Sequence, residues 1–500
     1  MEDSTRMSAI DEPVPASLPS RLCNKVVASV LCCAFAGAAL AWQPKRVYVE
    51  PFTTKAAPEK LRADLIAALS KQSGIALVSS ESSADAILGG GGEIWIRGYR
   101  SLNPRSGRLP SDGTPVYAGY LSVELRNTRG ETFWSYLATP ETGSEDVAKD
   151  LARRIAKHVA AALVAELAPP HAASPPQAAA ILKGAGATFP APMYAKWFTN
   201  YRRENPNVEI AYDAVGSEAG VRKLLAGDVD FGASDNPQAI HELSPGDEGR
   251  YLLFPSVVGA VVPIVNLPGV SGDIAFTPEA LAGIYLGKIT KWNDPILRQA
   301  NKGLSLPDLN IVAIHRVDGS GTSYAWTEFL SMAMPEWKAQ VGSGLAPKWP
   351  VGRAAAGNDG VASLVKELGG SIGYVEYIYA LQKHLSFGNV RNQAGEFVAA
   401  SLESIAAAVA HAAPVDDSLK VDDDFKISIV NAPGAGSYPM ASFTWLVVPS
   451  HFADEAKRSA MTSFLRWMLG PGQAQSAALG YLALPKDLVK REEAAIGRIH

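Results

Sequence analysis

The sequence predicts an α/β protein with more than one domain. From Ile181 onward, short apolar strands alternate with helical stretches, which is the pattern of a domain built on largely parallel sheets. Residues 44–168 repeat this alternation on a smaller scale. The chain has 500 residues, more than one hydrophobic core usually serves, so we expect two or three domains.

Composition indicates a folded chain and excludes several classes of function. Hydrophobic residues make up 47% of the chain and charged residues 19%, as in globular proteins. A formal net charge of −4 gives no general basic surface for nucleic acid. The three cysteines, Cys23, Cys32 and Cys33, all lie near the N-terminus. The rest of the chain therefore holds no disulfide framework, cysteine nucleophile or thiolate zinc site.

Residues 1–43 are predicted to be a tail followed by a signal peptide, with a membrane anchor as the alternative. The apolar run 26–41 follows Arg21 and Lys25 and ends in small residues, which is the order of a secretory signal. A run of roughly 17 apolar residues can just span a bilayer, so the anchor stays open. In both cases we expect an exported protein in the periplasm or cell envelope.

Residues 44–168 predict a small α/β module whose role the residues do not reveal. Its expected elements are a strand at 47–49, a helix behind Pro58, strands at 75–78 and 94–96, a hairpin over 121–137 that turns at 127–130, and a closing helix that begins at Ser144. Residues 89–92 are all glycine, and we expect a flexible connection there because no Lys-Ser/Thr pair follows, as a phosphate loop would require. Residues 169–178, with prolines among alanines, predict a semi-rigid linker.

Three polar turns at predicted strand ends of residues 179–490 carry candidate chemistry. The first, residues 184–190, is a glycine turn that runs into a helix. The second, residues 216–220, opens another helix, where Ser217 could cap the helix or direct its hydroxyl at an anion. The third follows a buried strand and ends at Asp235. A ligand in an α/β domain tends to bind beyond the carboxyl ends of such strands.

A fourth turn, residues 316–323, gives the strongest signal. Arg316 is followed by two glycines and several hydroxyl side chains, between a predicted strand and a predicted helix. A guanidinium with converging backbone N–H groups suits a tetrahedral oxyanion. Asp318 is placed to orient the arginine. The four turns together predict an anion site.

With further motifs, these turns closely resemble the PstS family of phosphate-binding proteins that serve ABC transporters. The motifs, in chain order, are residues 184–190, 191–197, 230–235, 284–289, 291–294, 318–323, 357–360 and 372–377. The resemblance covers residues 181–490, more loosely after residue 450, and residues 1–178 show nothing of it. It implies a two-lobed periplasmic-binding-protein fold of type II, with a hinge between the lobes and phosphate in the cleft.

The resemblance also implies which residues hold the phosphate. By motif they are Thr188, Phe189, Ser217, Asp235, Arg316, Ser320, Gly321 and Thr322, with Asp318 supporting the arginine. Phosphate at neutral pH keeps a proton that the Asp235 carboxylate can accept, whereas fully ionised sulfate would be repelled. We expect inorganic phosphate and the permease subunits of an ABC transporter as partners, and neither a cofactor nor catalysis.

Two features depart from the family pattern. Glu218 stands where a small residue is usual, and we expect it to point to solvent and to favour the helix N-terminus. The module of residues 44–168 precedes a glycine motif that normally follows the signal peptide closely. Docking onto a transporter could therefore be altered.

Three functional hypotheses stay open. Capture of phosphate for transport is the first. An enzyme acting on phosphate esters would need a metal or an activated nucleophile, and the scattered histidines provide no ligand pair. A phosphate-responsive interaction or sensor protein would act through residues 44–168 and would need an unknown envelope partner for them.

Overall fold

The computed structural model describes residues 45–52, 58–100, 114–141, 146–164, 179–270, 272–411, 413–414 and 425–500. The predicted signal peptide or anchor, the linker and the Ser144 helix start lie outside these residues. Contacts gather residues 45–500 into one compact unit. In the part of the chain that the structure describes, no helix combines the length and the apolar character needed to cross a membrane.

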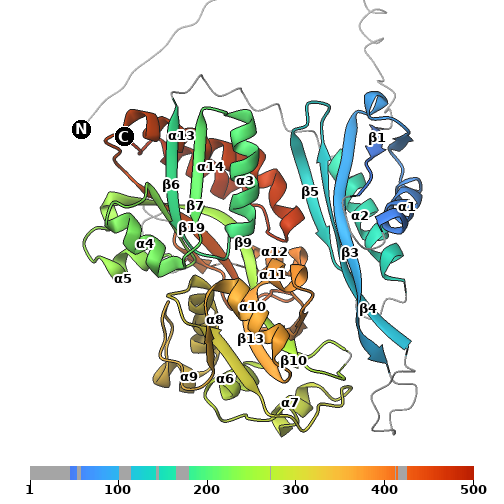
Figure 1. Ribbon diagram of the computed structural model, residues 1–500, viewed down its shortest axis with the longest axis vertical. Coiled ribbons are helices and arrows are strands. Elements are labelled where there is room, and N and C mark those ends of the chain that lie inside the picture. Colours follow the sequence, from blue (N-terminus) through green and yellow to red (C-terminus); the bar gives the residue numbers. More distant parts are fainter. Residues whose placement is uncertain are drawn as a thin grey trace, which may run out of the picture. The chain divides into compact units, whose positions relative to one another are not determined.

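The long strand β9 (Tyr251–Asn266) joins two half-sheets. Nearly every residue of this apolar strand is buried, as expected for a strand covered on both faces. Its residues 251–260 pair antiparallel with β19 (Ala441–Pro449), and its residues 261–266 pair antiparallel with β13 (Ser371–Glu376). The change of partner within one continuous strand marks the hinge, and it confirms the predicted two-lobed α/β fold (Figure 1).

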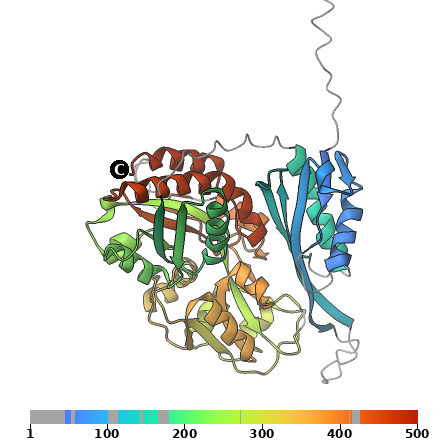
Figure 2. The same ribbon diagram turned by 45° about the horizontal axis from the view of Figure 1, so that its top comes forward.

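Lobe 1 comprises residues 180–260 and 441–500. Its strands follow the order β9-β19-β8-β6-β7, in which β6, β7 and β8 are parallel and each leads into a helix, as predicted. Figure 2 shows the C-terminal helices, in red, lying along this half-sheet. The elements are β6 (Ala180–Gly186), α3 (Ala191–Glu204), β7 (Val208–Asp213), α4 (Ser217–Leu225), β8 (Phe231–Ser234), α5 (Ala239–Leu243), α13 (Glu455–Trp467), the short helical turns η3 (Met468–Gly472) and η4 (Gln473–Leu479), and α14 (Lys486–Ile496).

Lobe 2 comprises residues 261–440. Its half-sheet has the order β12-β11-β13-β9, and a small sheet of β10, β15 and β16 lies beside it. The elements are β10 (Ala275–Phe276), α6 (Pro278–Tyr285), α7 (Pro295–Ala300), β11 (Val312–Arg316), α8 (Gly321–Ala333), α9 (Pro335–Gln340), β12 (Arg353–Ala355), α10 (Gly357–Glu367), α11 (Tyr377–Gln382), β14 (Ser386–Phe387), β15 (Asn389–Arg391), β16 (Phe397–Val398), α12 (Leu402–Ala410), β17 (Ala413–Pro414) and β18 (Ile427–Ser428).

Residues 45–164, here called the front module, form a sheet of their own with the order β2-β1-β3-β4-β5. Leu65 of the first helix and Leu151 and Ile155 of the second are fully buried in the packing of helices on sheet. The predicted strands, helices and hairpin are all confirmed. They are β1 (Lys45–Val49), α1 (Pro58–Leu69), β2 (Ile75–Val78), the turn η1 (Glu81–Ser83), β3 (Ala86–Arg100), β4 (Thr114–Arg126), β5 (Thr132–Ala138) and α2 (Val147–Val164).

The predicted flexible connection at residues 89–92 is wrong. These glycines lie inside β3 and pair with β4, from Gly89 opposite Glu124 to Gly92 opposite Leu121. A Cβ added to Gly90 would lie 2.3 Å from the Ser122 carbonyl oxygen, so the backbones approach closely here. The local composition suggests flexibility, whereas pairing with a later strand decides the structure.

Candidate functional site

Lobe 1 brings three of the predicted polar turns to one edge. Thr188 and Phe189 follow β6, Ser217 begins α4 after β7, and Asp235 follows β8. All four are buried, with exposed fractions between 0% and 9%. Parallel strands end at the same edge of a sheet, which explains why turns separated in sequence meet here.

Ser217 does not cap its helix. Gly216 occupies the cap position with φ of 98°, and Ser217 is the first helical residue. Its hydroxyl oxygen instead accepts hydrogen bonds from the backbone N–H of Gly321 at 3.1 Å and of Asp235 at 3.4 Å. Of the two roles that the sequence left open, capping is therefore excluded, and the hydroxyl lies inside the site.

Lobe 2 contributes the cation. Arg316 is the last residue of β11 and is 3% exposed. Its Nε donates to Asp318 Oδ1 at 2.8 Å, and a terminal guanidinium nitrogen forms an ion pair with the other carboxylate oxygen. Burial alone would raise the pKa of Asp318, but hydrogen bonding and charge attraction from Arg316, with the Gly357 N–H, hold it below its usual range. The arginine is thus fixed in orientation by an ionised partner.

The start of α8 places backbone donors beside the arginine. Ser320 is the N-cap, and its hydroxyl oxygen accepts from the Ser323 N–H at 3.1 Å. Arg316 Nη1 lies 3.4 Å from Thr322 Oγ1. A Cβ added to Gly321 would lie 2.3 Å from Asp235 Oδ2, so only glycine lets the carboxylate pack against this helix end.

Direct contacts join the two lobes across the site. The Glu218 N–H of lobe 1 donates to the Gly319 carbonyl of lobe 2 at 3.0 Å. Asn358 Nδ2 of lobe 2 donates to Thr188 Oγ1 of lobe 1 at 2.9 Å and lies 3.4 Å from Thr322 Oγ1. The structure therefore shows a closed arrangement of a two-lobed hinge protein.

The Asp235 carboxyl group is the most unusual group in the site. Its side chain is buried, and Thr444 donates its hydroxyl hydrogen to Oδ1. Oδ2 is buried without a hydrogen-bond partner among the described residues. Burial raises the pKa of Asp235 to about 7, against the opposing effects of Thr444 and Arg316. A buried acceptor without a partner normally needs a donor, such as a proton on a ligand.

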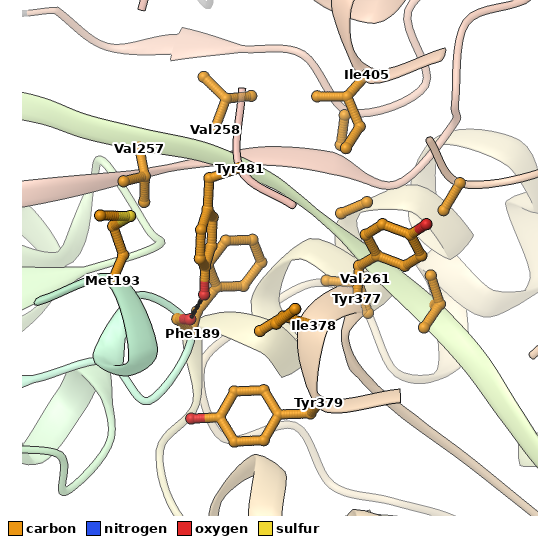
Figure 3. Close-up of a cluster of buried hydrophobic side chains, with 14 of the residues drawn as sticks. Phe189, Met193, Val257, Val258, Val261, Tyr377, Ile378, Tyr379, Ile405 and Tyr481 are labelled. Carbon is orange, nitrogen blue, oxygen red and sulfur yellow. Dashed lines mark hydrogen bonds between the residues drawn. The ribbon is translucent and has the colours of Figure 1, made fainter. Parts of the chain in front are cut away.

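Two tyrosines hold the backbone of the first turn from behind. The Tyr481 hydroxyl donates to the Phe189 carbonyl at 2.6 Å, and the Tyr379 hydroxyl donates to the Thr188 carbonyl at 2.8 Å. Figure 3 shows the Tyr481 contact within a buried cluster that also contains the Phe189 ring. Because that ring belongs to the core, only the backbone of Phe189 can face a ligand.

Glu218 is paired at the protein surface. Arg222, one helical turn later, donates to its carboxylate at 2.9 and 2.8 Å. The Glu218 side chain is 26% exposed. The carboxylate is thus only partly exposed, since it also packs against Gly319 of the lobe 2 turn, and Arg222 compensates its charge.

The structure adds residues that the sequence reasoning did not assign to the site. Asn358 lies in the 357–360 motif that contributes to the family resemblance, so its position could have drawn attention. Thr444 has a weaker signal, as one of two hydroxyl residues, with Ser442, in the otherwise apolar strand β19. Among the described residues, no group of three or more His, Cys, Asp or Glu side chains is arranged to hold a metal ion.

Comparisons with known proteins match the two-lobed region. A PBP superfamily domain matches residues 172–471. The phosphate-binding protein PstS of Xylella fastidiosa is 41% identical over 314 residues, which is 63% of this chain and 84% of that protein. PstS of Pasteurella multocida is 38% identical over 314 residues, 63% of this chain and 89% of that protein. A solved phosphate-binding protein from Stenotrophomonas maltophilia is 20% identical, covering 63% of this chain and 94% of its own, with a TM-score of 0.48.

Proposed function

Because the chain belongs to the PstS family of phosphate-binding proteins, within the PBP superfamily, we propose that it captures inorganic phosphate between its lobes and delivers it to an ABC transporter. Relatives that carry this name align over most of their own length with residues of the two-lobed region. We propose an exported protein of the periplasm or cell envelope, whose transport partner is a membrane permease.

The observation that carries the proposal is the unpartnered Oδ2 of Asp235 opposite a set of donors. Monohydrogen phosphate has one proton to donate and three oxygens that accept. Arg316 and the Ser217 and Thr322 hydroxyls are donors on neighbouring turns, and Gly321, whose N–H donates to the Ser217 hydroxyl oxygen, packs against the same carboxylate. One acceptor among many donors matches a singly protonated tetrahedral anion.

The site is nearly neutral despite its anionic ligand. The charge of Arg316 is offset by Asp318, to which it is bound, so attraction relies on aligned dipoles and hydroxyls as well as on the guanidinium. We propose that the phosphate contacts are the eight residues predicted from the sequence: Thr188, Phe189 through its backbone, Ser217, Asp235, Arg316, Ser320, Gly321 and Thr322. Asp318 and Thr444 position the arginine and the aspartate.

Titration calorimetry of the anion-free full chain with phosphate tests this proposal. We expect one saturable site per chain that still binds phosphate in excess chloride. Incubation with a phosphate monoester should release no phosphate, because we propose binding without turnover. The absence of saturable phosphate binding would contradict the proposal.

A second candidate function is a phosphate-responsive sensor that acts through the front module. It is favoured by contacts of the front module with both lobes, for example Ser122 with lobe 1 and Arg97 with lobe 2. Such a sensor requires an envelope partner for residues 45–164. Crosslinking of the full chain in its own cell envelope, with and without phosphate, should then give a product that depends on phosphate.

A further inference from the structure

Hydrogen bonds between serine side chains of the front module and the backbone of lobe 1 join the two. The Ser122 hydroxyl of β4 donates to the Ala478 carbonyl at 2.7 Å. The Ser135 hydroxyl of β5 donates to the Ala474 carbonyl at 2.6 Å, and the Ala478 N–H donates back to Ser135 Oγ at 3.2 Å. All of these lobe 1 groups lie in η4, so β4 and β5 hold this helical turn from one side.

The front module also contacts lobe 2, through β3. The Trp95 ring stacks on the His384 ring, with centroids 4.3 Å apart and an interplanar angle of 19°. Arg97 donates to the Gly272 carbonyl at 2.8 Å and to the Ser386 hydroxyl at 3.2 Å, and forms an ion pair with Asp273. The Arg97 side chain is only 18% exposed, so this contact is partly withdrawn from water.

A third contact lies beside the hinge. Tyr136 donates its hydroxyl hydrogen to the Glu403 carboxylate on α12, and Arg154 of α2 lies 3.4 Å from the same group. The helix α12 packs against both β9 and β19, the strands that connect the lobes. The front module therefore contacts lobe 1, lobe 2 and the hinge region between them.

The contacts with the two lobes come from one stiff ribbon. β3 and β4 are paired without interruption from Gly91, opposite Ser122, through Trp95, opposite Ala118, and the register shifts only at Arg97. Strands rise about 3.3 Å per residue, so the Ser122 contact with lobe 1 and the Trp95 contact with lobe 2 lie about 13 Å apart along the ribbon. Hinge bending moves one lobe relative to the other. A hydrogen-bonded ribbon cannot lengthen, so it cannot keep its contacts with both lobes when they move apart.

We infer that the front module is an interaction surface for the closed form of its own two-lobed region, which it braces by binding both lobes at once. The contacts are made to lobes that already touch across the site, as Glu218 and Gly319 do. Opening must break contacts at one end of the ribbon. The brace therefore favours closure before any ligand binds and slows ligand release.

The same contacts reach the first turn of the site. A Cβ added to Gly480 would lie 3.4 Å from Leu137 of the front module, and the next residue is Tyr481. The Tyr481 hydroxyl holds the Phe189 carbonyl at 2.6 Å. None of the predicted site residues contacts the front module in the segments named here. The front module therefore affects binding by fixing the positions of the lobes, and it does not cover the groups that bind the ligand.

The test compares the distance between lobes in the full chain with and without the contacts that Trp95 and Arg97 make to lobe 2. Spin labels go on cysteines introduced at Asp228 in lobe 1 and Ala339 in lobe 2, both exposed, after Cys23, Cys32 and Cys33 are changed to serine. Electron-resonance distance measurements without anion then give the closed fraction. The variant is Trp95→Ala with Arg97→Ala, and the matched control is Arg46→Ala, which breaks an exposed ion pair with Asp85 inside the front module.

We expect the ligand-free wild type and the control to be mainly closed, and the double variant to populate a longer distance. Its phosphate dissociation constant should rise on the order of tenfold, mostly through faster release, because less of the protein is pre-closed. His384→Asn is a second variant that removes, from the lobe 2 side, both the Trp95 stack and the ring contact with Glu93 of β3. Asparagine tolerates the positive φ of 56° at this position, and the front module keeps its own sequence.

Distance distributions that match wild type in both variants would overturn the brace. If the double variant does not fold, His384→Asn alone decides the question. The affinity part of this test rests on the proposed function, but the ligand-free distances do not. A wild type that binds no phosphate would therefore refute the proposed function while the brace is still judged on the closed fraction.

Discussion

The two lobes supply opposite charges to the same cleft and handle them differently. Lobe 2 presents Arg316, whose charge is permanent and is fixed by an ionised partner, Asp318. Lobe 1 presents Asp235, whose charge is conditional because burial raises its pKa to about 7. We propose that the two lobes have different roles in binding: Arg316 of lobe 2 attracts the anion, and Asp235 of lobe 1 favours an anion that carries a proton over one that does not.

The largest expected effect is the loss of the cation from lobe 2. Arg316→Met should weaken phosphate binding by about 10²- to 10³-fold, because it removes the guanidinium and leaves the partly buried Asp318 carboxylate without its cation. Calorimetric titration measures the change. Arg222→Met is the matched control, since that arginine pairs with Glu218 at the surface, and it should bind within about threefold of wild type. If the Arg316→Met protein bound phosphate like wild type, lobe 2 would not supply the charge that attracts the anion.

The next effect concerns the stability of the ligand-free protein and belongs to lobe 1. The folded-state pKa of Asp235 lies above its usual value of 3.8, so the neutral acid is favoured in the fold. Its stabilising contribution is complete below about pH 4 and is lost as the pH rises through about 7. Asparagine does not ionise, so the Asp235→Asn variant should not lose stability in this way as the pH rises.

Urea unfolding without anion checks that difference. Between pH 5 and pH 8 the free energy of unfolding of the wild type should fall by on the order of 2 kcal/mol more than that of Asp235→Asn. Glu328, whose pKa burial raises to about 7, is present in both proteins, so its contribution cancels in the comparison. Equal pH dependence in the two proteins would show that Asp235 is ionised in the fold.

A smaller effect is expected from the hydroxyl that orients the carboxylate. Thr444→Val removes the donor to Asp235 Oδ1 and with it an influence that lowers the pKa of Asp235. Asp235 is then protonated in a larger fraction of the molecules at pH 7, and the protonated carboxyl group can donate a hydrogen bond to sulfate. The preference for phosphate over sulfate should fall about tenfold, and Thr444→Ser should restore it. Unchanged preference in the valine variant would assign Thr444 to packing alone.

The smallest effect is expected at Glu218, the departure from the family pattern. Its carboxylate is partly exposed and paired with Arg222. Glu218→Gln should therefore change phosphate affinity by less than about threefold, since exposed ion pairs contribute little. A larger gain in affinity would mean that the negative charge reaches the cleft.

The sequence predicted the fold and the four turns because their signals are local. Strand, glycine turn and helix follow one another directly at residues 184–190 and 316–323. Parallel pairing of β6 with β7 and β8 brings the three lobe 1 turns to one edge, whereas the turn at residues 316–323 belongs to lobe 2 and meets them across the cleft. Thr444 could not be assigned, because its partner Asp235 lies 209 positions earlier and only the antiparallel pairing of β19 with β8 brings them together.

The front module shows the same limit more strongly. Its strands and helices were predicted correctly from periodicity, yet the glycines of residues 89–92 were not, because pairing with β4 is non-local. Its contacts with the lobes depend on single side chains such as Trp95 and Arg97, which carry no motif. Local sequence patterns therefore predict helices and strands, whereas the contacts between these elements become known only from the folded structure.

The role of Asp235 in selecting phosphate is tested by comparing anion preference in wild type and Asp235→Asn. Both proteins, freed of bound anion, are titrated with phosphate and with sulfate at pH 8 by calorimetry. We expect tight phosphate and weak sulfate binding in wild type, and sulfate affinity within about tenfold of phosphate affinity in the variant, because an amide no longer repels a fully ionised anion. An unchanged preference in the variant would show that Asp235 does not discriminate between the two anions.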